Sequence, residues 1–302
     1  MYDVIVIGAG INGSFIAHEL SKKQCRVMLL DKCGDIADGS TMANSAIIHS
    51  GHDPKPGTLK AKLNVRGNRM YPKICEELGV DYKQCSAFVV ATDDGENEVL
   101  DMLMGQAKDR DIPFNMLTGS EARELEPNLS DAVIRAMELP TTGVVYPWNV
   151  AIALVEEAVL NGLELRLNEE VLDIKKENKK FLVKTSECEY EAKYVVNAAG
   201  VFADDIYAMV LGKAPDFSIT ARRGEYYVLD KQEKPVVNRI IYPVPGATGK
   251  GILVVPTVYG NVLLGPNSES IDDKTANCTT SDALATVKKG VNKTVSNIPF
   301  DK

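Results

Sequence analysis

Hydrophobic and polar positions fall into clear blocks over the first thirty residues. Residues 3–7 begin with an aspartate and continue as an unbroken apolar run that ends in glycines, which predicts a buried parallel strand. Ile11, Phe15, Ile16 and Leu20 give an expected helix over residues 13–23 one apolar face. Residues 26–30 form a second apolar run. The pattern therefore predicts a βαβ unit.

The middle of the chain alternates between helical and strand-like patterns. Helices are expected over residues 59–78, 98–110, 118–126 and 148–161, and strands over 88–90, 143–146, 164–168, 171–175, 181–185 and 194–197. The last hundred residues contain short apolar runs at 225–229, 240–242, 252–255 and 262–264, separated by Pro and Gly. This pattern predicts an antiparallel sheet in a second domain of α+β type.

These blocks predict an α/β fold made of two interleaved domains. A Rossmann-type nucleotide-binding domain is expected over residues 1–80 and 147–215. A substrate domain carrying the antiparallel sheet is expected over residues 81–146 and 216–302.

Composition and charge exclude several classes of protein. The 302 residues are 45% apolar and 25% charged, which is typical of a globular protein. The net charge of −8 and the pI of about 5.1 argue against a nucleic-acid partner. The six cysteines are scattered without a C-x-x-C pair, so no metal or iron–sulfur site is expected. Without a signal peptide or a membrane-length apolar run, we expect no transmembrane segment and a cytoplasmic location.

A glycine-rich turn joins the first expected strand to the first expected helix. Gly8, Gly10 and Gly13 give the G-x-G-x-x-G pattern, in which the glycines allow a tight turn, the approach of a pyrophosphate, and close packing of helix on strand. The N–H groups of the helix N-terminus would then face the phosphates. Asp31 follows eighteen residues after Gly13, where a carboxylate accepts hydrogen bonds from ribose hydroxyls. The pattern predicts dinucleotide binding.

The choice of dinucleotide depends on a resemblance. Residues 8–31 resemble the N-terminal FAD-binding pattern of the glutathione reductase-like flavoproteins, with matches at Ala17, Leu20, Val27 and Asp31. The small and hydroxyl residues 39–45 suit a backbone that wraps a pyrophosphate and approaches a flat ring. FAD is therefore the expected cofactor, and NAD is the alternative. The residues expected to contact FAD are Gly8, Gly10, Ile11, Asn12, Gly13, Asp31, Lys32, Ser40, Thr41, Asn44, Ser45, Ala46, Ile47, Val171, Ala199 and Gly200.

Further motifs resemble the D-amino-acid-oxidase-like flavoprotein superfamily. They lie at residues 46–51, 55–63, 82–85, 197–200, 223–226, 241–245 and 264–267, and are most similar to those of L-2-hydroxyglutarate and glycerol-3-phosphate dehydrogenases. Leu253 and Thr257 stand where the hydroxyglutarate enzymes carry a histidine and an arginine. The superfamily normally ends with a further βαβ return, which this sequence lacks, so a chain without its C-terminal end is expected.

The resemblance implies oxidation of a small anionic secondary alcohol, glycerol 3-phosphate or a 2-hydroxy acid of the L-2-hydroxyglutarate kind. The hydride passes to the flavin N5, and a base removes the hydroxyl proton. His49 is the candidate base, because imidazole titrates near working pH; its alternative role is to position the loop. Arg223 is the candidate catalytic and substrate-binding guanidinium, with a surface salt bridge as its alternative. Lys55 could add positive charge around the substrate site, or be a solvated loop lysine.

Other readings of the sequence stay open. The chain could be an amine or amino-acid oxidase of the same superfamily. It could also be a catalytically silent FAD-binding fragment or an electron-transfer subunit. The expected partners are the small anionic substrate and an electron acceptor, which is a quinone, oxygen or another redox protein. A quinone acceptor would be compatible with peripheral attachment to a membrane.

Overall fold

The computed structural model describes residues 1–246 and 251–302, and these residues divide into two units of packing. The first unit contains residues 1–44, 147–221 and 271–275. The second unit contains residues 45–146, 222–270 and 276–302. The chain returns to the first unit at residue 147, the position at which the predicted nucleotide-binding domain resumes. Residues 45–80, which the sequence pattern assigned to that domain, pack within the second unit.

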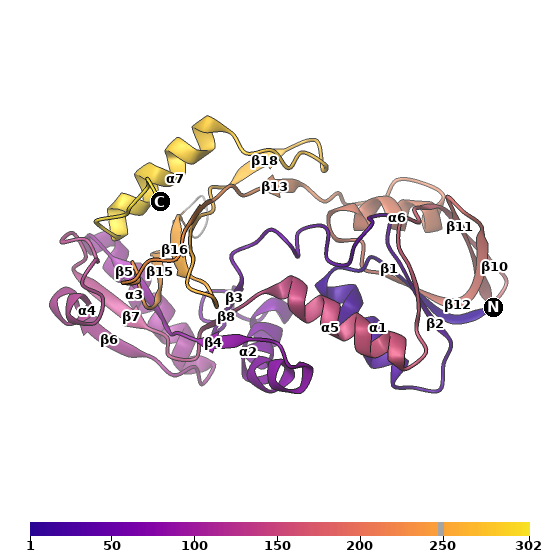
Figure 1. Cartoon of the computed structure of the whole chain (residues 1–302), viewed down its shortest axis with the longest axis horizontal. Coiled ribbons are helices and arrows are strands. Elements are labelled where there is room, and N and C mark those ends of the chain that lie inside the picture. Colours follow the sequence, from indigo (N-terminus) through magenta and orange to yellow (C-terminus); the bar gives the residue numbers. More distant parts are fainter. Residues whose placement is uncertain (247–250) are drawn as a thin grey trace. The chain divides into compact units, whose positions relative to one another are not determined.

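The first unit is built around a six-stranded sheet of order β10-β11-β12-β1-β2-β9 (Figure 1). Its elements are β1 (Tyr2–Ile7), α1 (Ile11–Ser21), β2 (Val27–Leu30), α5 (Pro147–Leu160), β9 (Glu164–Arg166), β10 (Val171–Glu177), β11 (Lys180–Thr185), β12 (Glu189–Asn197), the 3₁₀ helix η1 (Gly200–Phe202) and α6 (Ala203–Leu211). Strands β12, β1, β2 and β9 are parallel, and β10 and β11 add an antiparallel hairpin. The βαβ unit predicted for the first thirty residues is therefore confirmed.

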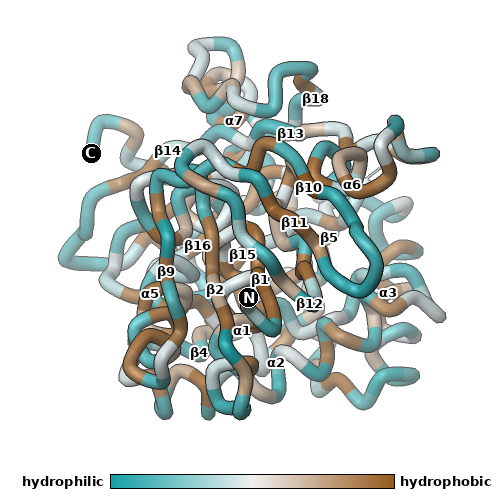
Figure 2. Tube along the Cα trace, turned by 90° about the vertical axis from the view of Figure 1, so that its right-hand side faces the viewer, coloured by the Kyte–Doolittle hydropathy of each residue, from teal (hydrophilic) through white to brown (hydrophobic). Residues whose placement is uncertain are grey.

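Strand β1 lies in the middle of this sheet, and Figure 2 shows most of β1 and β2 in the hydrophobic colours. Val4 and Val6 pack with Ala17 of α1 and with α5, while Ile5 and Ile7 pack with residues of β10, β11 and α6. A strand that is buried on both faces reads as a continuous apolar run rather than an alternating one. The two faces of β1 thus contribute to two separate apolar clusters of the first unit, one on each side of the sheet.

The second unit is built around a seven-stranded mixed sheet of order β14-β17-β16-β15-β5-β7-β6 and a three-stranded sheet of order β3-β8-β4. Its elements are β3 (Ile47–Ile48), α2 (Leu59–Leu78), β4 (Tyr82–Gln84), β5 (Ala87–Ala91), α3 (Asp94–Asp109), β6 (Asn115–Thr118), α4 (Gly119–Leu125), β7 (Arg135–Glu138), β8 (Gly143–Val145), β14 (Tyr227–Leu229), β15 (Ile240–Pro243), β16 (Leu253–Pro256), β17 (Val262–Gly265) and α7 (Ser281–Thr294). Strands β13 (Ala221–Arg223) and β18 (Glu269–Ile271), where the chain passes between units, form a two-stranded sheet.

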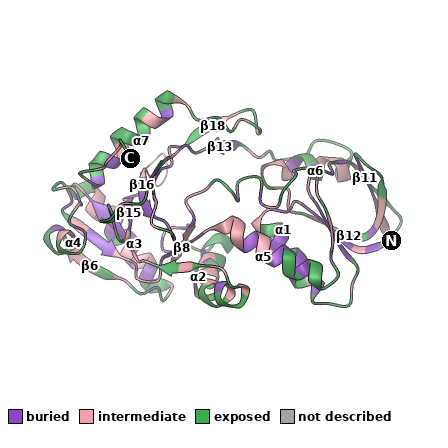
Figure 3. Cartoon of the chain, viewed as in Figure 1, coloured by how far each residue is buried: buried purple, intermediate pink, exposed green. Residues whose placement is uncertain are grey.

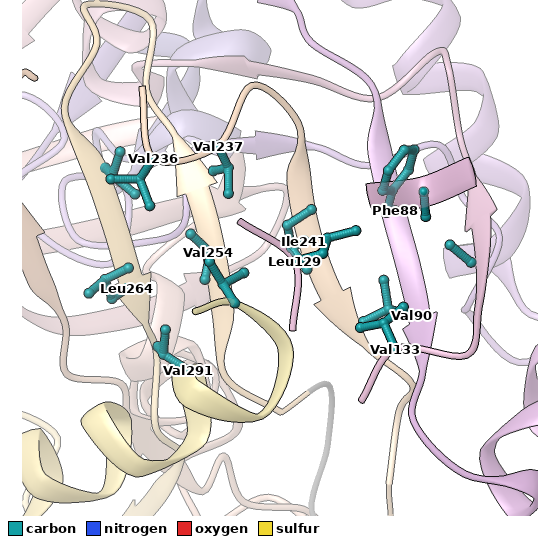
Figure 4. Close-up of a cluster of buried hydrophobic side chains, with 14 of the residues drawn as sticks. Phe88, Val90, Leu129, Val133, Val236, Val237, Ile241, Val254, Leu264 and Val291 are labelled. Atoms are coloured by element: carbon teal, nitrogen blue, oxygen red, sulfur yellow. The ribbon is translucent and has the colours of Figure 1, made fainter. Parts of the chain in front are cut away.

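The antiparallel sheet predicted for the last hundred residues is confirmed, since β14, β17, β16 and β15 pair antiparallel in that order. Strand β15 also pairs in parallel with β5, which joins these strands to the earlier part of the chain. Phe88 and Val90 of β5 face the cluster shown in Figure 4, which includes Val287 and Val291 of α7. Val89 faces the opposite cluster, against α3. Both faces of the large sheet are therefore covered by helices.

Candidate functional site

The glycine-rich turn between β1 and α1 leaves no room for side chains. A Cβ on Gly13 would lie 1.8 Å from the carbonyl oxygen of Gly8, and a Cβ on Gly8 would lie 2.4 Å from the carbonyl oxygen of Ala198. Gly8 also has a φ of 104°, a left-handed conformation that glycine adopts without steric cost. The first and third glycines of the pattern are thus required by close backbone contacts, as the sequence predicted.

The first turn of α1 is hydrogen-bonded to the segment of residues 40–44. Thr41 accepts a hydrogen bond from Ile11 N through Oγ1 at 3.0 Å, and Asn44 Nδ2 donates to the carbonyl oxygens of Ser40 and Thr41 at 3.0 and 2.8 Å. These bonds fold residues 40–44 over the turn. The N–H of Asn12 belongs to the first turn of the helix and has no carbonyl partner within the helix. It is therefore available to an anion.

Asp31 links the end of β2 to the glycine-rich turn. Its carboxylate accepts hydrogen bonds from Ala9 N at 2.6 Å and from Cys33 N at 2.9 Å. Asp31 N donates to the carbonyl oxygen of Arg166, and Glu169 N donates to the carbonyl oxygen of Asp31, so the chain beyond β9 is fixed beside it. A carboxylate has about four acceptor positions, and two N–H donors leave positions for ribose hydroxyls.

These segments surround a cavity of about 470 Å³ within the first unit. Pockets for cofactors and small ligands have volumes of roughly 300–1,000 Å³. Twelve of the residues predicted to contact FAD line the cavity: Gly8, Gly10, Ile11, Asn12, Asp31, Lys32, Ser40, Thr41, Asn44, Val171, Ala199 and Gly200. Gly13 packs beneath the turn, and Ser45, Ala46 and Ile47 belong to the second unit. The donor set, the carboxylate and the absence of Cβ atoms at the turn fit the phosphates and ribose of a dinucleotide.

Several lining residues were not among those predicted from the sequence. Glu169 and Glu170 reach the cavity because the chain between β9 and β10 is tied to residues 31–33 by backbone hydrogen bonds. Phe202 also lines the cavity, and Lys32 places its Nζ 3.6 Å from the centroid of the Phe202 ring. An aromatic ring beside a predicted nucleotide segment could have been noticed. The positions of the two glutamates depend on how distant strands pair, so these residues could not have been identified from the sequence.

One wall of the cavity is fixed by a lysine from a distant part of the chain. Lys274 Nζ lies 2.6 Å from Asp204 Oδ1 and 2.9 Å from Asp205 Oδ2, at the start of α6. Asp204 also accepts a hydrogen bond from Ile219 N at 2.8 Å. These hydrogen bonds, first that of Ile219 and then that of Lys274, lower the pKa of Asp204 to about 2. The short segment 271–275 therefore contributes to the first unit by anchoring the residues that follow η1.

The predicted base, His49, lies in a polar cluster of the second unit. Its Nδ1 is 2.9 Å from the hydroxyl of Tyr242. Burial, followed by the charge of Asp53, raises the pKa of Tyr242 well above 10, so the phenol keeps its proton. When Nδ1–H donates to the phenol oxygen, Nε2 carries a lone pair and can accept a proton. The arrangement is compatible with a base and does not by itself assign that role.

The loop that carries His49 is held by contacts on both sides of it. Ser45 Oγ lies 3.0 Å from the hydroxyl of Tyr226. Arg110 donates to the carbonyl oxygens of Gly51, His52 and Pro54 at 2.6, 3.0 and 2.5 Å. The side chain of Lys55, the next residue, is exposed. The loop is therefore well fixed up to residue 54, and the role of Lys55 stays a prediction.

Arg223 lies in a salt-bridge network that its predicted anion-binding role did not anticipate. Its Nε is 3.0 Å from Glu225 Oε1, and its Nη2 is 3.0 Å from Glu269 Oε2. Glu225 is only 2% exposed and also accepts a hydrogen bond from Thr280 N, at the start of α7, at 2.5 Å. An anionic substrate would have to compete with two carboxylates for this guanidinium. The geometry favours the structural alternative for Arg223.

This network predicts a large effect on stability. The change Glu225→Ala is expected to lower the free energy of unfolding by about 3 kcal/mol, because it leaves the α7 N-terminus without its carboxylate and the Arg223 guanidinium with only the exposed Glu269. Glu269→Ala is the matched control: that carboxylate contacts the same arginine but is 52% exposed, so a loss below about 1 kcal/mol is expected. Urea unfolding followed by circular dichroism measures both. Equal losses would contradict the assignment of Glu225 as the structural partner.

Two classes of feature are not found among residues 1–246 and 251–302. No helix there has both the length and the apolar character that crossing a bilayer requires. Nor does that part of the chain bring three His, Cys, Asp or Glu side chains together as ligands for a metal ion.

Comparison with known proteins gives a consistent result over the whole chain. A family model described as FAD-dependent oxidoreductase matches residues 3–299. A glycerol 3-phosphate dehydrogenase of Caloramator mitchellensis is 43% identical over 302 residues, which are 100% of this chain and 62% of that protein. An L-2-hydroxyglutarate dehydrogenase of Escherichia coli is 33% identical over 89% of this chain and 64% of that protein. The chain thus spans less than two thirds of the length of these two relatives.

A solved structure agrees with these sequence matches. The dithionite-reduced L-α-glycerophosphate oxidase of Mycoplasma pneumoniae, solved with FAD bound, superposes with a TM-score of 0.92 at 30% identity. The match covers 97% of this chain and 78% of that one.

Proposed function

The chain belongs to the FAD-dependent oxidoreductase family, and from this premise we propose that it is a flavoprotein dehydrogenase that oxidises a small anionic secondary alcohol. Glycerol 3-phosphate is our first candidate substrate, and a 2-hydroxy acid of the L-2-hydroxyglutarate kind is the second. The order follows the relatives, since the glycerol 3-phosphate dehydrogenase is 43% identical and the hydroxyglutarate enzyme 33%.

The observation that carries the proposal is the cavity of the first unit. It combines a turn that excludes side chains, the N-terminus of a helix and the Asp31 carboxylate. We assign the N–H groups at the start of α1 to the pyrophosphate of FAD, and Asp31 to its ribose. The residues 40–44 that fold over the turn would restrict the entry of water. FAD, when bound, supplies the acceptor for the hydride of the substrate.

The second unit would supply the groups that act on the substrate. We propose that His49 removes the hydroxyl proton through Nε2, while its Nδ1–H is directed to the Tyr242 hydroxyl. Ser45, Ala46 and Ile47, which precede His49 in the sequence, are proposed to contact the flavin. Arg223 is not included, because its Nε and Nη2 already contact two glutamates, with which an anionic substrate would compete. The electron acceptor is proposed to be a quinone, oxygen or another redox protein. The protein itself is proposed to be cytoplasmic, with peripheral attachment to the membrane if the acceptor is a quinone.

The test is the absorption spectrum of the purified chain, before and after the addition of excess FAD and removal of the unbound part. A retained flavin spectrum that bleaches anaerobically with glycerol 3-phosphate, or with L-2-hydroxyglutarate, supports the proposal. Bleaching by glycine or proline instead would identify an amino-acid oxidase. A bound flavin that no substrate bleaches would identify a silent fragment or an electron-transfer subunit. A chain that stays colourless would refute the assignment of FAD binding to these residues.

A further inference from the structure

Three carbonyl oxygens of one buried loop converge on an arginine at the end of α3. Arg110 is the C-cap of this helix, and its Nη1 donates to the carbonyl oxygens of Gly51 at 2.6 Å and His52 at 3.0 Å. Its Nη2 donates to the carbonyl oxygen of Pro54 at 2.5 Å and to Gln106 Oε1 at 2.9 Å. All four acceptors are uncharged, so the arginine binds the loop through its main chain. We call Arg110 with the three carbonyl groups the Arg110 clamp.

His49 lies between a paired strand and this clamp. Ile48, the residue before it, pairs with Gly143 of β8. Ser50, the residue after it, places its Oγ 3.0 Å from Nδ1 of His52, and the carbonyl oxygen of His52 is held by the clamp. The main chain around His49 is therefore fixed on both sides, and the clamp provides one of the two fixed points.

The clamped loop also packs closely on α2. Gly51 has a φ of 94°, and a Cβ on it would lie 2.7 Å from Val65 Cγ2 and 3.0 Å from Val65 N. Gly51, His52 and Pro54 are all buried. A buried carbonyl oxygen that loses its donor is destabilised, so removal of the guanidinium is expected to shift the loop and the main chain next to it.

We propose that Arg110 is a positioning residue for the reaction, and that it acts by holding His49 where Nε2 can take the hydroxyl proton of the substrate. The proposal rests on the proposed function, because the effect of Arg110 is exerted through His49. Tyr242 holds Nδ1 of the imidazole, so the place of Nε2 depends on that bond and on the main chain that the clamp fixes. An arginine suits this task, because its planar fork offers several donors in a fixed geometry.

The first test compares kcat, KM and flavin content in Arg110→Ala, Arg110→Lys and the unaltered chain. Arg110→Ala is expected to lower kcat by about a hundredfold, the loss expected for a reacting group misplaced by about 1 Å. KM and flavin content are expected to stay close to those of the unaltered chain, since the FAD cavity lies in the other unit. Arg110→Lys is expected to lose about tenfold, because an ammonium group cannot serve three separate oxygens as the guanidinium does.

The matched control is Arg69→Ala. The side chain of Arg69 also joins α2 to the end of α3 through a main-chain oxygen, since its Nη2 donates to the carbonyl oxygen of Asp111 at 3.2 Å. Figure 3 shows exposed residues along α2, and Arg69 is one of them. Because this bond lies outside the clamped loop, its loss is expected to leave kcat unchanged.

Chemical rescue separates a lost clamp from a disturbed fold. Arg110 lines a cavity of about 560 Å³ together with residues from the 57–65 segment, so a small cation is expected to reach the place of the missing guanidinium. Guanidinium chloride, at a concentration well below that which unfolds the protein, is expected to raise the kcat of Arg110→Ala at least about tenfold. Methylammonium chloride at the same concentration is expected to have no such effect, and neither salt should accelerate the unaltered chain.

A measurement without substrate distinguishes a failure of this proposal from a failure of the proposed function. The chain has three histidines, so its imidazole Cε1–H signals in NMR spectra are few, and the signal of His49 is the one that disappears in His49→Asn. In Arg110→Ala the His49 signal is expected to shift, while that of His18, in the first unit, stays in place. If no substrate bleaches the flavin, the proposed function fails and the His49 signal still decides whether the clamp acts on this residue.

Four outcomes would overturn the proposal. They are an unmoved His49 signal in Arg110→Ala, a kcat of this variant close to that of the unaltered chain, an equal loss in Arg69→Ala, and a loss that neither lysine nor guanidinium relieves. The last result would make Arg110 a residue that supports the fold without positioning His49.

Discussion

Replacement of Gly13 by alanine is expected to abolish the retention of FAD. A Cβ at this position would lie 1.8 Å from the carbonyl oxygen of Gly8, and 3.0 Å from its carbonyl carbon. Both atoms belong to the backbone, so no side-chain movement relieves the contact, and the turn must open. We expect FAD binding to weaken by at least about a hundredfold, or about 2.7 kcal/mol. Flavin absorbance that stays with the protein through gel filtration measures the loss.

The control for this change is Gly39→Ala. Gly39 lines the same cavity, and nothing lies within 4 Å of a Cβ built at this position. The variant is expected to keep its flavin and its unfolding midpoint. If both alanine variants retained FAD equally well, the close contact at Gly13 would not be what shapes the phosphate site.

Replacement of His49 by asparagine is expected to lower kcat by about 10²–10⁴-fold, the usual contribution of a positioned general base. Flavin content should not change, because Asp31 and the glycine-rich turn are in the other unit. Stopped-flow bleaching of the flavin by the substrate measures the effect directly. The experiment rests on the proposed function and is informative only after one substrate has been shown to bleach the flavin.

Two further variants separate a base from a structural histidine. Tyr242→Phe removes the group 2.9 Å from His49 Nδ1, so we expect a smaller loss of kcat together with a shifted pH profile. His18→Gln alters a buried histidine that pairs with Glu157 at 3.0 Å in the first unit, and should affect stability without changing the rate per bound flavin. A kcat for His49→Asn within tenfold of the unaltered enzyme would show that another group takes the proton.

The local parts of the fold could be predicted from the sequence, because their causes are local. The apolar run of β1 and the spacing of Gly8, Gly10 and Gly13 specify a strand, a turn and a helix without reference to the rest of the chain. Asp31 could be placed for the same reason. The antiparallel strands of the last hundred residues were recognisable from short apolar runs between Pro and Gly, and the structure confirms them.

Features that depend on distant pairing could not be predicted. Helix α7 is an exception, because Ala283, Val287 and Val291 recur at helical spacing after the N-cap Thr280, a local pattern that could have indicated the helix. The parallel pairing of β15 with β5 joins residues about 150 positions apart, and no turn sequence signals it. Arg223 illustrates the same limit, since its partner Glu269 lies 46 residues away. Its other carboxylate, Glu225, is only two residues away, but nothing local indicated that this glutamate is buried against the start of α7.

The central position of β1 also constrains how the protein is made. Val6 is paired with Leu29 on one side and with Val196 on the other. On the ribosome, β1 therefore emerges long before β12, while residues 45–146 are synthesised in between. During that interval one edge of an apolar strand lacks its native neighbour, which is a typical point of aggregation for parallel sheets. The apolar edge of the nascent first unit would thus stay unpaired until β12 (Glu189–Asn197) has been translated.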